Sequence, residues 1–109
     1  RLILADALAY AVKEGAVEII DLATLTGACV VALGRGISGL MSNDDGLASR
    51  LTAIADKEGE PLWRLPLHKD YEKKLKSEVA DLKNSPGREA ATITAALFLE
   101  EFVGDTPWA

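Results

Sequence analysis

The side chains that commonly carry out chemistry are scarce in this sequence. It contains a single histidine, His68, and a single cysteine, Cys29. His68 stands in LPLHKD beside a strongly charged stretch and without a second histidine or cysteine nearby, so we interpret it as solvent-facing rather than as a metal ligand. Cys29 lies among Ala28, Val30 and Val31, which favours a buried, unreactive thiol over a nucleophile.

A glycine motif at residues 34–39 matches the GxGxxG pattern of dinucleotide-binding proteins. In those proteins the motif follows a strand and opens a helix, so that the pyrophosphate meets the helix N-terminus. Here the preceding ACVVAL is typical of a helix and the following GLMSN is typical of a strand. Because this order is inverted, we interpret the motif as a glycine-rich turn. The alternative is a nucleotide-binding domain, which NAD or ATP would protect against thermal unfolding.

The stretch DLATLTGA, residues 21–28, carries little side-chain chemistry, but its pattern indicates a buried strand that leads through a turn into a helix. Open α/β sheets bind ligands at the carboxyl ends of their strands, and a following helix directs free N–H groups toward them. Asp21 and the backbone of Thr24–Gly27 are therefore a candidate binding surface. An ordinary strand-to-helix connection is the competing interpretation.

Two further charged residues are ambiguous. Asp81 and Lys83 stand two positions apart on an expected strand, which puts both side chains on the same side of it. The sequence leaves a structural pair and a pair that faces a site equally open. The charges of KDYEKKLKSE, by contrast, are most simply a solvated helix face.

Alternating helices and short apolar strands position these candidates. Gly15 is expected to end the first helix with a positive φ, and Asn43–Asp45 to cap a later one that Gly59 ends. Besides that later helix, we expect helices at 2–14, 28–33, 68–78 and 88–103, strands at 16–22, 37–41, 63–67 and 79–82, and a turn at 84–87. The strand at 16–22 is expected to be buried on both faces. This alternation predicts an α/β fold with a substantially parallel sheet.

Composition narrows the classes of function. The 109 residues suffice for one domain or part of one, and 49% hydrophobic with 27% charged residues is ordinary globular composition. A net charge of −5 argues against a nucleic-acid binder that depends on a basic patch. No apolar run approaches the roughly 20 residues of a membrane span. Because both ends fall inside expected elements and no initiator methionine is present, we expect an internal piece of a longer protein.

Several longer stretches resemble one enzyme family. RLILADAL at 1–8 is similar to the continuation of the NTDAEGRL signature of the leucine aminopeptidase (cytosol aminopeptidase) family. The same family is resembled, in the same order, by DLATLTGACVVALG at 21–34, SGLMSND at 38–44, VADLKNS at 79–85, REAATITAALFLEEFV at 88–103 and PWA at 107–109. The resemblance covers essentially the whole chain and corresponds to the middle-to-late part of the family's catalytic domain.

This resemblance implies a three-layer α/β/α sandwich around a mixed, largely parallel sheet, with residues 1–109 as part of a single metallopeptidase catalytic domain cut at both ends. It implies a hydrolase that releases N-terminal residues, often leucine, from peptides by means of two divalent metal ions, zinc or manganese. The family's metal ligands precede the arginine aligned with Arg1. The chain alone is therefore expected to bind no metal and to be inactive, and its parent to be a cytoplasmic homohexamer.

The resemblance also implies roles for individual residues. Arg1 aligns with the arginine that holds a bicarbonate ion, the general base, and a guanidinium suits such a planar anion. Thr24, Leu25, Thr26 and Gly27 align with the turn that lines the substrate site. Their backbone groups bind the main chain of the substrate, while Thr24 and Gly27 border the pocket for its first side chain. Such a small wall admits many side chains, and glycine at 27 allows close approach.

The chain departs from the family pattern in three places. It lacks the Asp-x-Glu expected before Arg1 and the HLDIAG expected after residue 109, and Ala91 stands where many relatives have glycine. A non-catalytic α/β binding or assembly module of the same fold is the alternative from another functional class. A lysine and acids with metal-ligand chemistry upstream of Arg1 in the parent reading frame would distinguish the two.

Overall fold

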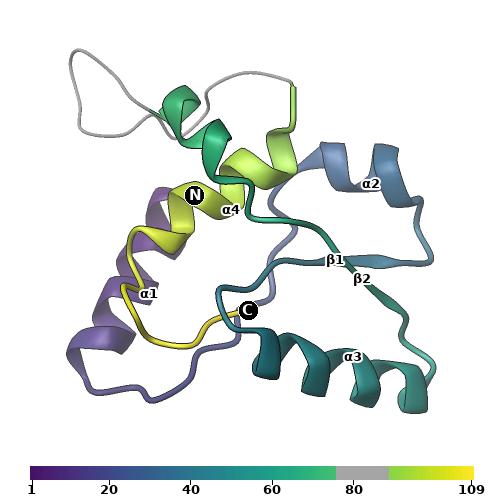
Figure 1. Cartoon of the computed structure of the whole chain (residues 1–109), viewed down its shortest axis with the longest axis horizontal. Coiled ribbons are helices and arrows are strands. Elements are labelled where there is room, and N and C mark those ends of the chain that lie inside the picture. The colour runs from purple at the N-terminus through teal and green to yellow at the C-terminus, as the bar shows by residue number, and fades with distance from the viewer. Residues whose placement is uncertain (76–88) are drawn as a thin grey trace.

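The structure is a computed structural model, and it describes residues 1–75 and 89–109 (Figure 1). In chain order the described elements are α1 (Leu2–Lys13), α2 (Gly27–Leu33), β1 (Ser38–Leu40), α3 (Asp45–Glu58), β2 (Leu62–Arg64), the 3-10 helix η1 (Lys69–Leu75) and α4 (Ala91–Glu100). Helices and parallel strands in one chain confirm a mixed α/β fold. The strand expected at 79–82, the turn expected at 84–87 and the pair Asp81 and Lys83 lie outside the described residues.

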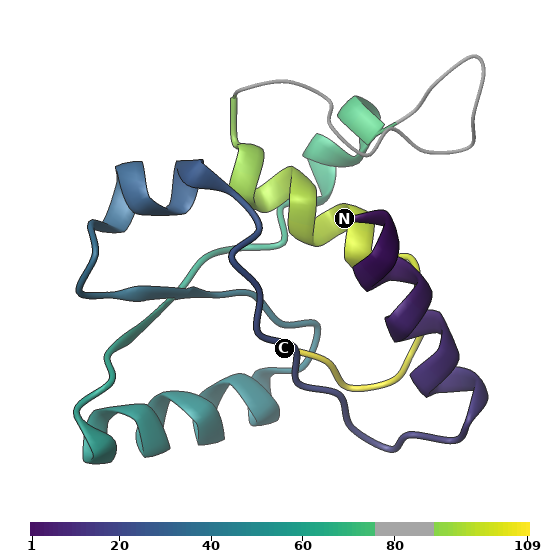
Figure 2. The ribbon, with the colours of Figure 1, turned by 180° about the vertical axis from the view of Figure 1, so that it is seen from behind.

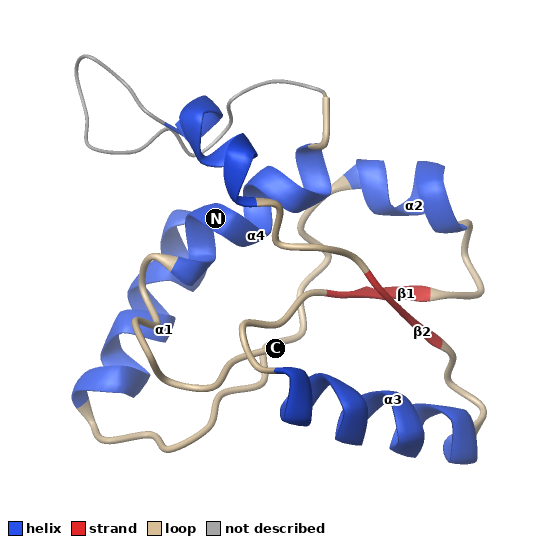
Figure 3. Ribbon diagram, viewed as in Figure 1, coloured by secondary structure: helices blue, strands red, loops and turns tan. Residues whose placement is uncertain are grey.

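The two strands form a small parallel sheet between two helices (Figure 3). Ser38 pairs with Leu62 and Leu40 with Arg64, and the N–H of Leu65 donates to the carbonyl of Leu40 at 2.8 Å. Helix α2 packs against β1 and α3 packs against β2. This layered arrangement follows from parallel pairing, which requires a crossover between the strands, and α3 supplies it.

A second parallel pairing joins residues 19–21 to the C-terminal segment 107–109. The N–H of Ile19 donates to Pro107, the N–H of Ala109 donates back to Ile19, and the N–H of Asp21 donates to Ala109. The prediction of a strand over 16–22 buried on both faces was therefore wrong in extent and in burial. Only Ile19 and Trp108 form a bridge, and Leu22 is 96% exposed. An apolar run shows strand character, but its burial depends on neighbours that the run does not contain.

The main core is built around α4. Its residues from Thr94 to Leu99 are all buried, and those from Ala96 to Leu99 form one core cluster with Ala5 and Leu8 of α1, Leu75 of η1, and Trp108. The chain's N-terminus lies over this helix in Figures 1 and 2, and α1 packs against it. Leu4, Ala11 and Val12 also pack against this core, so the apolar side of α1 is its core-facing side.

Helix α4 is shorter than the predicted 88–103. It begins after Ala90, whose φ of 51° is left-handed, and such a backbone costs an alanine about 1 kcal/mol. It ends at Glu100, where the N–H groups of Phe102 and Val103 bond three residues back and tighten the chain into turns. Gly104 follows with a φ of 56°.

The other boundaries test the remaining predictions. Asp44 caps α3 through a 2.7 Å bond from the Leu47 N–H, and Gly59 ends that helix in the left-handed region, both as predicted. Gly15 has the predicted positive φ, at 87°. The helix expected at 68–78 is, within its described part, the 3-10 helix η1. The strands expected at 37–41 and 63–67 are each reduced to three residues.

Candidate functional site

The turn of Thr24–Gly27 leads from extended backbone directly into α2. Thr26 is the N-cap, with φ −135° and ψ 136°, and α2 begins at Gly27, one residue before the predicted start. Thr24 and Gly27 are exposed, whereas Leu25 and Thr26 are half-buried. The turn therefore presents one side to the surroundings and rests on the protein with the other.

Two side chains hold the buried side of this turn. Leu25 packs against the main core, and the Thr26 hydroxyl lies 3.0 Å from the hydroxyl of Thr92 on α4. Helix α4 also packs against α2. Sequence reasoning missed Thr92, because a hydroxyl pair 66 residues apart leaves no local pattern.

The structural requirement for glycine differs between Gly27 and Gly39. A Cβ at Gly27 would meet no described atom within 4 Å, and its φ is not positive, so neither packing nor backbone conformation demands glycine. A Cβ at Gly39, on β1, would lie 2.8 Å from the Cys29 sulfur of α2. Cys29 is half-buried against this strand, which corrects the prediction of a fully buried thiol.

Asp21 has a structural partner. Its carboxylate accepts a 2.5 Å hydrogen bond from the indole N–H of Trp108, and its backbone N–H donates to Ala109. The indole ring is buried and would otherwise leave its N–H without a partner. Asp21 therefore fixes the C-terminal segment beside residues 19–21, and this role accounts for its position before the turn.

Arg1, the other residue predicted for the site, is the N-cap of α1. It is half-buried, and the loss of hydration lowers the pKa of its guanidinium from the usual value. An arginine so perturbed still carries its charge in a protein. Because α4 packs against both α1 and α2, this one helix supports the two elements that carry Arg1 and the turn.

The glycine motif at 34–39 begins at the end of α2 and runs into β1, whose first two residues are Ser38 and Gly39. A helix thus precedes the motif and a strand forms at its end, which confirms the inverted order predicted from the sequence. Gly34 is the C-cap of α2 with a φ of 73°. No helix begins at the motif to meet a pyrophosphate, so the nucleotide-binding interpretation loses its structural basis.

His68 is exposed, as predicted. Its ring stacks edge-on against Tyr71 with centroids 4.7 Å apart, and its Nε2 lies 3.6 Å from an Asp70 oxygen. In the described part of the chain, no three His, Cys, Asp or Glu side chains gather where they could hold a metal ion. The described residues thus do not fit a metal site.

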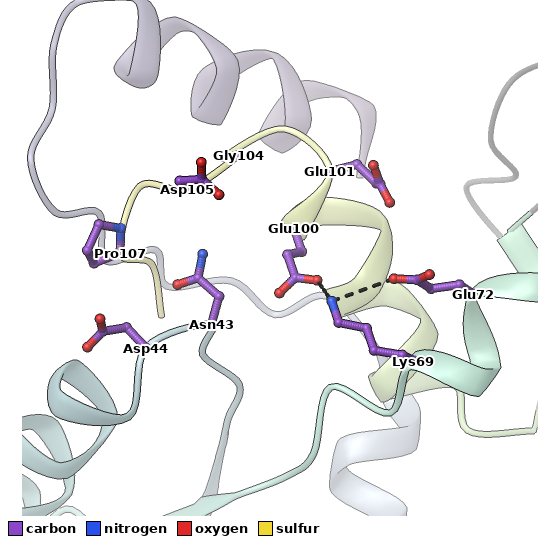
Figure 4. A pocket seen from close by; sticks show the side chains of 9 residues that line it. All are labelled: Asn43, Asp44, Lys69, Glu72, Glu100, Glu101, Gly104, Asp105 and Pro107. Atoms are coloured by element: carbon purple, nitrogen blue, oxygen red, sulfur yellow. Dashed lines mark hydrogen bonds and ion pairs between the residues drawn. The ribbon is translucent and has the colours of Figure 1, made fainter.

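An open pocket of about 420 Å³ lies between α4, η1 and the start of α3 (Figure 4). Its lining is mostly acidic, and Lys69 forms ion pairs with Glu72 and Glu100 across it. None of the residues predicted for the substrate site lines this pocket. Its charges are paired with each other or solvated, so it remains a surface feature of the scaffold.

Comparison with known proteins connects this geometry to a family. The model of the cytosol aminopeptidase family, catalytic domain, matches residues 1–109, the whole chain. The chain belongs to the cytosol aminopeptidase family. The resemblance seen in the sequence motifs is thereby confirmed.

Relatives within this family share more than half of the residues. The chain is 58% identical over 109 residues to a probable cytosol aminopeptidase of Desulfotalea psychrophila, and 59% identical to one of Trichodesmium erythraeum. These alignments cover 99% and 100% of the chain but only 22% of each relative. The chain therefore spans about a fifth of the length of the curated relatives it matches.

A solved structure of the family has the same fold over this region. A mutant of tomato leucine aminopeptidase is 46% identical, with a TM-score of 0.95, and the match covers 98% of this chain and 21% of that one. The arrangement of helices and strands described above is thus that of the corresponding part of a leucine aminopeptidase. Among the helices of the described residues, none has the length and apolar character needed to cross a membrane.

Proposed function

We propose that this chain is part of the catalytic domain of a two-metal aminopeptidase that releases N-terminal amino acids, leucine among them, from peptides. The observation that carries the proposal is the family match over the whole chain. The matched residues include the turn at Thr24–Gly27, in which Thr24 and Gly27 are exposed while Leu25 and Thr26 are half-buried. In the complete protein, residues 1–109 would belong to a three-layer α/β/α sandwich around a mixed, largely parallel sheet, as one metallopeptidase domain continuing beyond both ends.

The turn would bind the main chain of the peptide substrate. Backbone groups of Thr24–Gly27 carry no charge and no side-chain specificity, so they would bind a peptide without selecting its side chains. Thr24 and Gly27, both exposed, would border the pocket for the first side chain. The open space above Gly27 supports this role, because neither packing nor backbone conformation explains why glycine is there.

Arg1 would hold a bicarbonate ion. A planar guanidinium donates two parallel N–H···O bonds to such an anion, and partial burial strengthens them by excluding water. Bicarbonate would supply a general base to the reaction when bound. What Arg1 itself contributes is a fixed positive charge and a fixed orientation for that anion.

As the resemblance to the family implies, the two divalent ions, zinc or manganese, would be held by residues that precede Arg1 in the complete protein. We accordingly expect the 109 residues alone to be inactive. The partners we propose are peptide substrates and identical subunits, in a cytoplasmic homohexamer. Neither a nucleic acid nor a membrane is among them.

The test is made on a full-length protein that carries this segment. We expect it to hydrolyse leucyl p-nitroanilide, to lose activity with a chelator and to regain it with Zn²⁺ or Mn²⁺. Gly27→Val, which fills the open space, should raise KM without lowering the thermal stability. Gly36→Val is the matched control, because a Cβ there also meets open space but lies in the glycine-rich turn. A full-length protein that binds peptides without hydrolysing them would favour the non-catalytic module instead.

A further inference from the structure

The N-cap of α2 does not use its side chain in the usual way. Threonine is among the residues favoured at an N-cap, because its hydroxyl accepts a hydrogen bond from the first turn of the helix. The Thr26 side chain makes no such bond. Its hydroxyl instead lies 3.0 Å from the Thr92 hydroxyl in the first turn of α4. Thr26 therefore connects two helices rather than closing the end of its own.

The turn has few other attachments. No residue of α2 is buried, and within the described residues no backbone hydrogen bond ties 22–26 to another element. Within the described residues, the other attachment of the turn is the apolar contact of Leu25 with the main core. A contact of that kind limits distance but not orientation, whereas a hydrogen bond is directional. The hydroxyl pair is thus suited to set how the turn is oriented.

Thr92 belongs to a helix that is held in place by many neighbours. The residues that follow it in α4, from Thr94 to Leu99, are buried, and the helix packs against α1, α2 and η1. A group attached to such a helix has little freedom to move. Thr92 itself is half-buried, so its bond to Thr26 is partly shielded from competing water.

We propose that Thr92 is a positioning residue, whose hydroxyl holds Thr26 and thereby orients the backbone of Thr24–Gly27 for the peptide substrate. This inference rests on the proposed function of the turn. Because the turn binds main-chain groups of the substrate, its disorientation weakens substrate binding in the ground state and the transition state alike. The expected signature is a raised KM with a nearly unchanged kcat.

The experiment measures kcat and KM of the full-length protein on leucyl p-nitroanilide. Thr92→Val keeps the shape of the side chain and removes the hydroxyl, and we expect KM to rise about three- to tenfold, the equivalent of one net hydrogen bond. Thr92→Ser keeps the hydroxyl and should restore KM to within about twofold. Thr26→Val should resemble Thr92→Val, and the double variant should be no worse than either single one, because both remove the same bond.

Thr52→Val is the matched control. The Thr52 hydroxyl bonds to the Ala48 carbonyl within α3, far from the turn in the chain, so its loss should leave KM unchanged. The inference is overturned if Thr92→Val lowers the melting temperature but not the affinity for substrate, or if Thr92→Ser fails to restore KM. If Thr92→Val does not fold, the Thr26→Val and Thr92→Ser pair decides by the same criteria.

The same data separate this inference from the proposed function. If Gly27→Val raises KM and Thr92→Val does not, the turn binds substrate and only the role of Thr92 is wrong. If neither Gly27→Val nor Thr92→Val changes KM, the assignment of the turn itself fails. A full-length protein without aminopeptidase activity would overturn both.

Discussion

Helices α4 and α2 are both strongly apolar, with the sequences ATITAALFLE and GACVVAL, but their surroundings are opposite. In α4 six consecutive residues are buried, on every side of the helix, whereas α2 has no buried residue and leaves Val31 88% exposed. Helix α4 packs against α1, η1 and the C-terminal segment. Helix α2 packs against β1 on one side and against α4 at its start.

The two helices therefore have different roles in the fold. Residues that are buried on all sides of a helix contribute stability and a fixed position, and they present no surface to a ligand. A helix with few internal contacts contributes little stability but leaves the turn before it accessible, provided that a neighbour holds that turn in place. The comparison predicts that changes at the buried residues of α4, Thr94 to Leu99, act on stability, and that changes at Arg1, the turn and Thr92 act on kinetics.

The largest effect is expected from Arg1→Ala in the full-length protein. It removes the guanidinium that we propose holds the bicarbonate base, and general-base catalysis is typically worth about 10² to 10⁴ in rate. We expect kcat on a leucyl substrate to fall within that range, while KM changes much less because the turn at Thr24–Gly27 is intact. Steady-state kinetics with and without added bicarbonate measures both.

Arg1→Lys is the control for this change. A lysine supplies the charge but not the planar pair of donors, so it should recover only part of the lost rate. Near-normal kcat and normal bicarbonate dependence in Arg1→Ala would show that the role carried over from the family does not apply to this residue.

The next largest effect is the loss of stability when a buried side chain of α4 is truncated. Leu97→Ala on α4 removes a side chain that is 1% exposed and should lower the free energy of unfolding by about 2–5 kcal/mol. Val31→Ala on α2 removes a side chain already in solvent and should change it by no more than about 0.5 kcal/mol. Denaturant unfolding of the full-length protein measures both. Equal costs at the two positions would mean that α2 is covered in the complete protein.

An intermediate effect is expected where α2 meets the sheet. Gly39→Ala places a Cβ 2.8 Å from the Cys29 sulfur, an overpacking that should cost about 1–3 kcal/mol. Cys29→Ala removes that sulfur, so the double variant should be more stable than Gly39→Ala alone. Cys29→Ala by itself should leave kcat nearly unchanged, and a hundredfold loss with the fold intact would reveal a functional thiol.

The smallest effect concerns pH. The hydrogen bond to Glu100 raises the pKa of Lys69 above its usual value; burial, the next largest influence, opposes this rise, and attraction from Glu100 and Glu72 adds to it. The stabilisation by this pair is complete below the unfolded pKa of about 10.4 and disappears as pH rises through the higher folded pKa. Lys69 is largely exposed, so the pair contributes at most about 1 kcal/mol.

Glu100→Gln tests this sign. At pH 8 the variant should melt slightly below the parent protein, and the difference should vanish at a pH above the raised pKa of Lys69. Glu101→Gln, at an exposed neighbouring position, is the control and should show no change in that pH range. A difference that grows with pH would reverse the assignment.

Local sequence alone predicted the features that depend on a few neighbouring residues. Asp44 caps α3, and Gly15 and Gly59 adopt positive φ. A helix also precedes the glycine motif and a strand forms at its end, which is the inverted order that the sequence predicted. Family membership was also legible, because ordered motifs over the whole chain cannot easily arise together by chance. Capping and turn conformation are encoded within a few positions, and each motif can be recognised from its own residues without knowledge of how the chain packs.

Only the tertiary structure decided which apolar residues are buried and which distant groups meet. The run from 16 to 22 is apolar, yet only Ile19 is buried, because burial depends on the segment 107–109 that lies beside it. The Asp21 carboxylate accepts a hydrogen bond from Trp108, 87 residues away, and the Thr26 hydroxyl contacts that of Thr92, 66 residues away. Such contacts follow from how the whole chain packs, and no local periodicity or propensity records them.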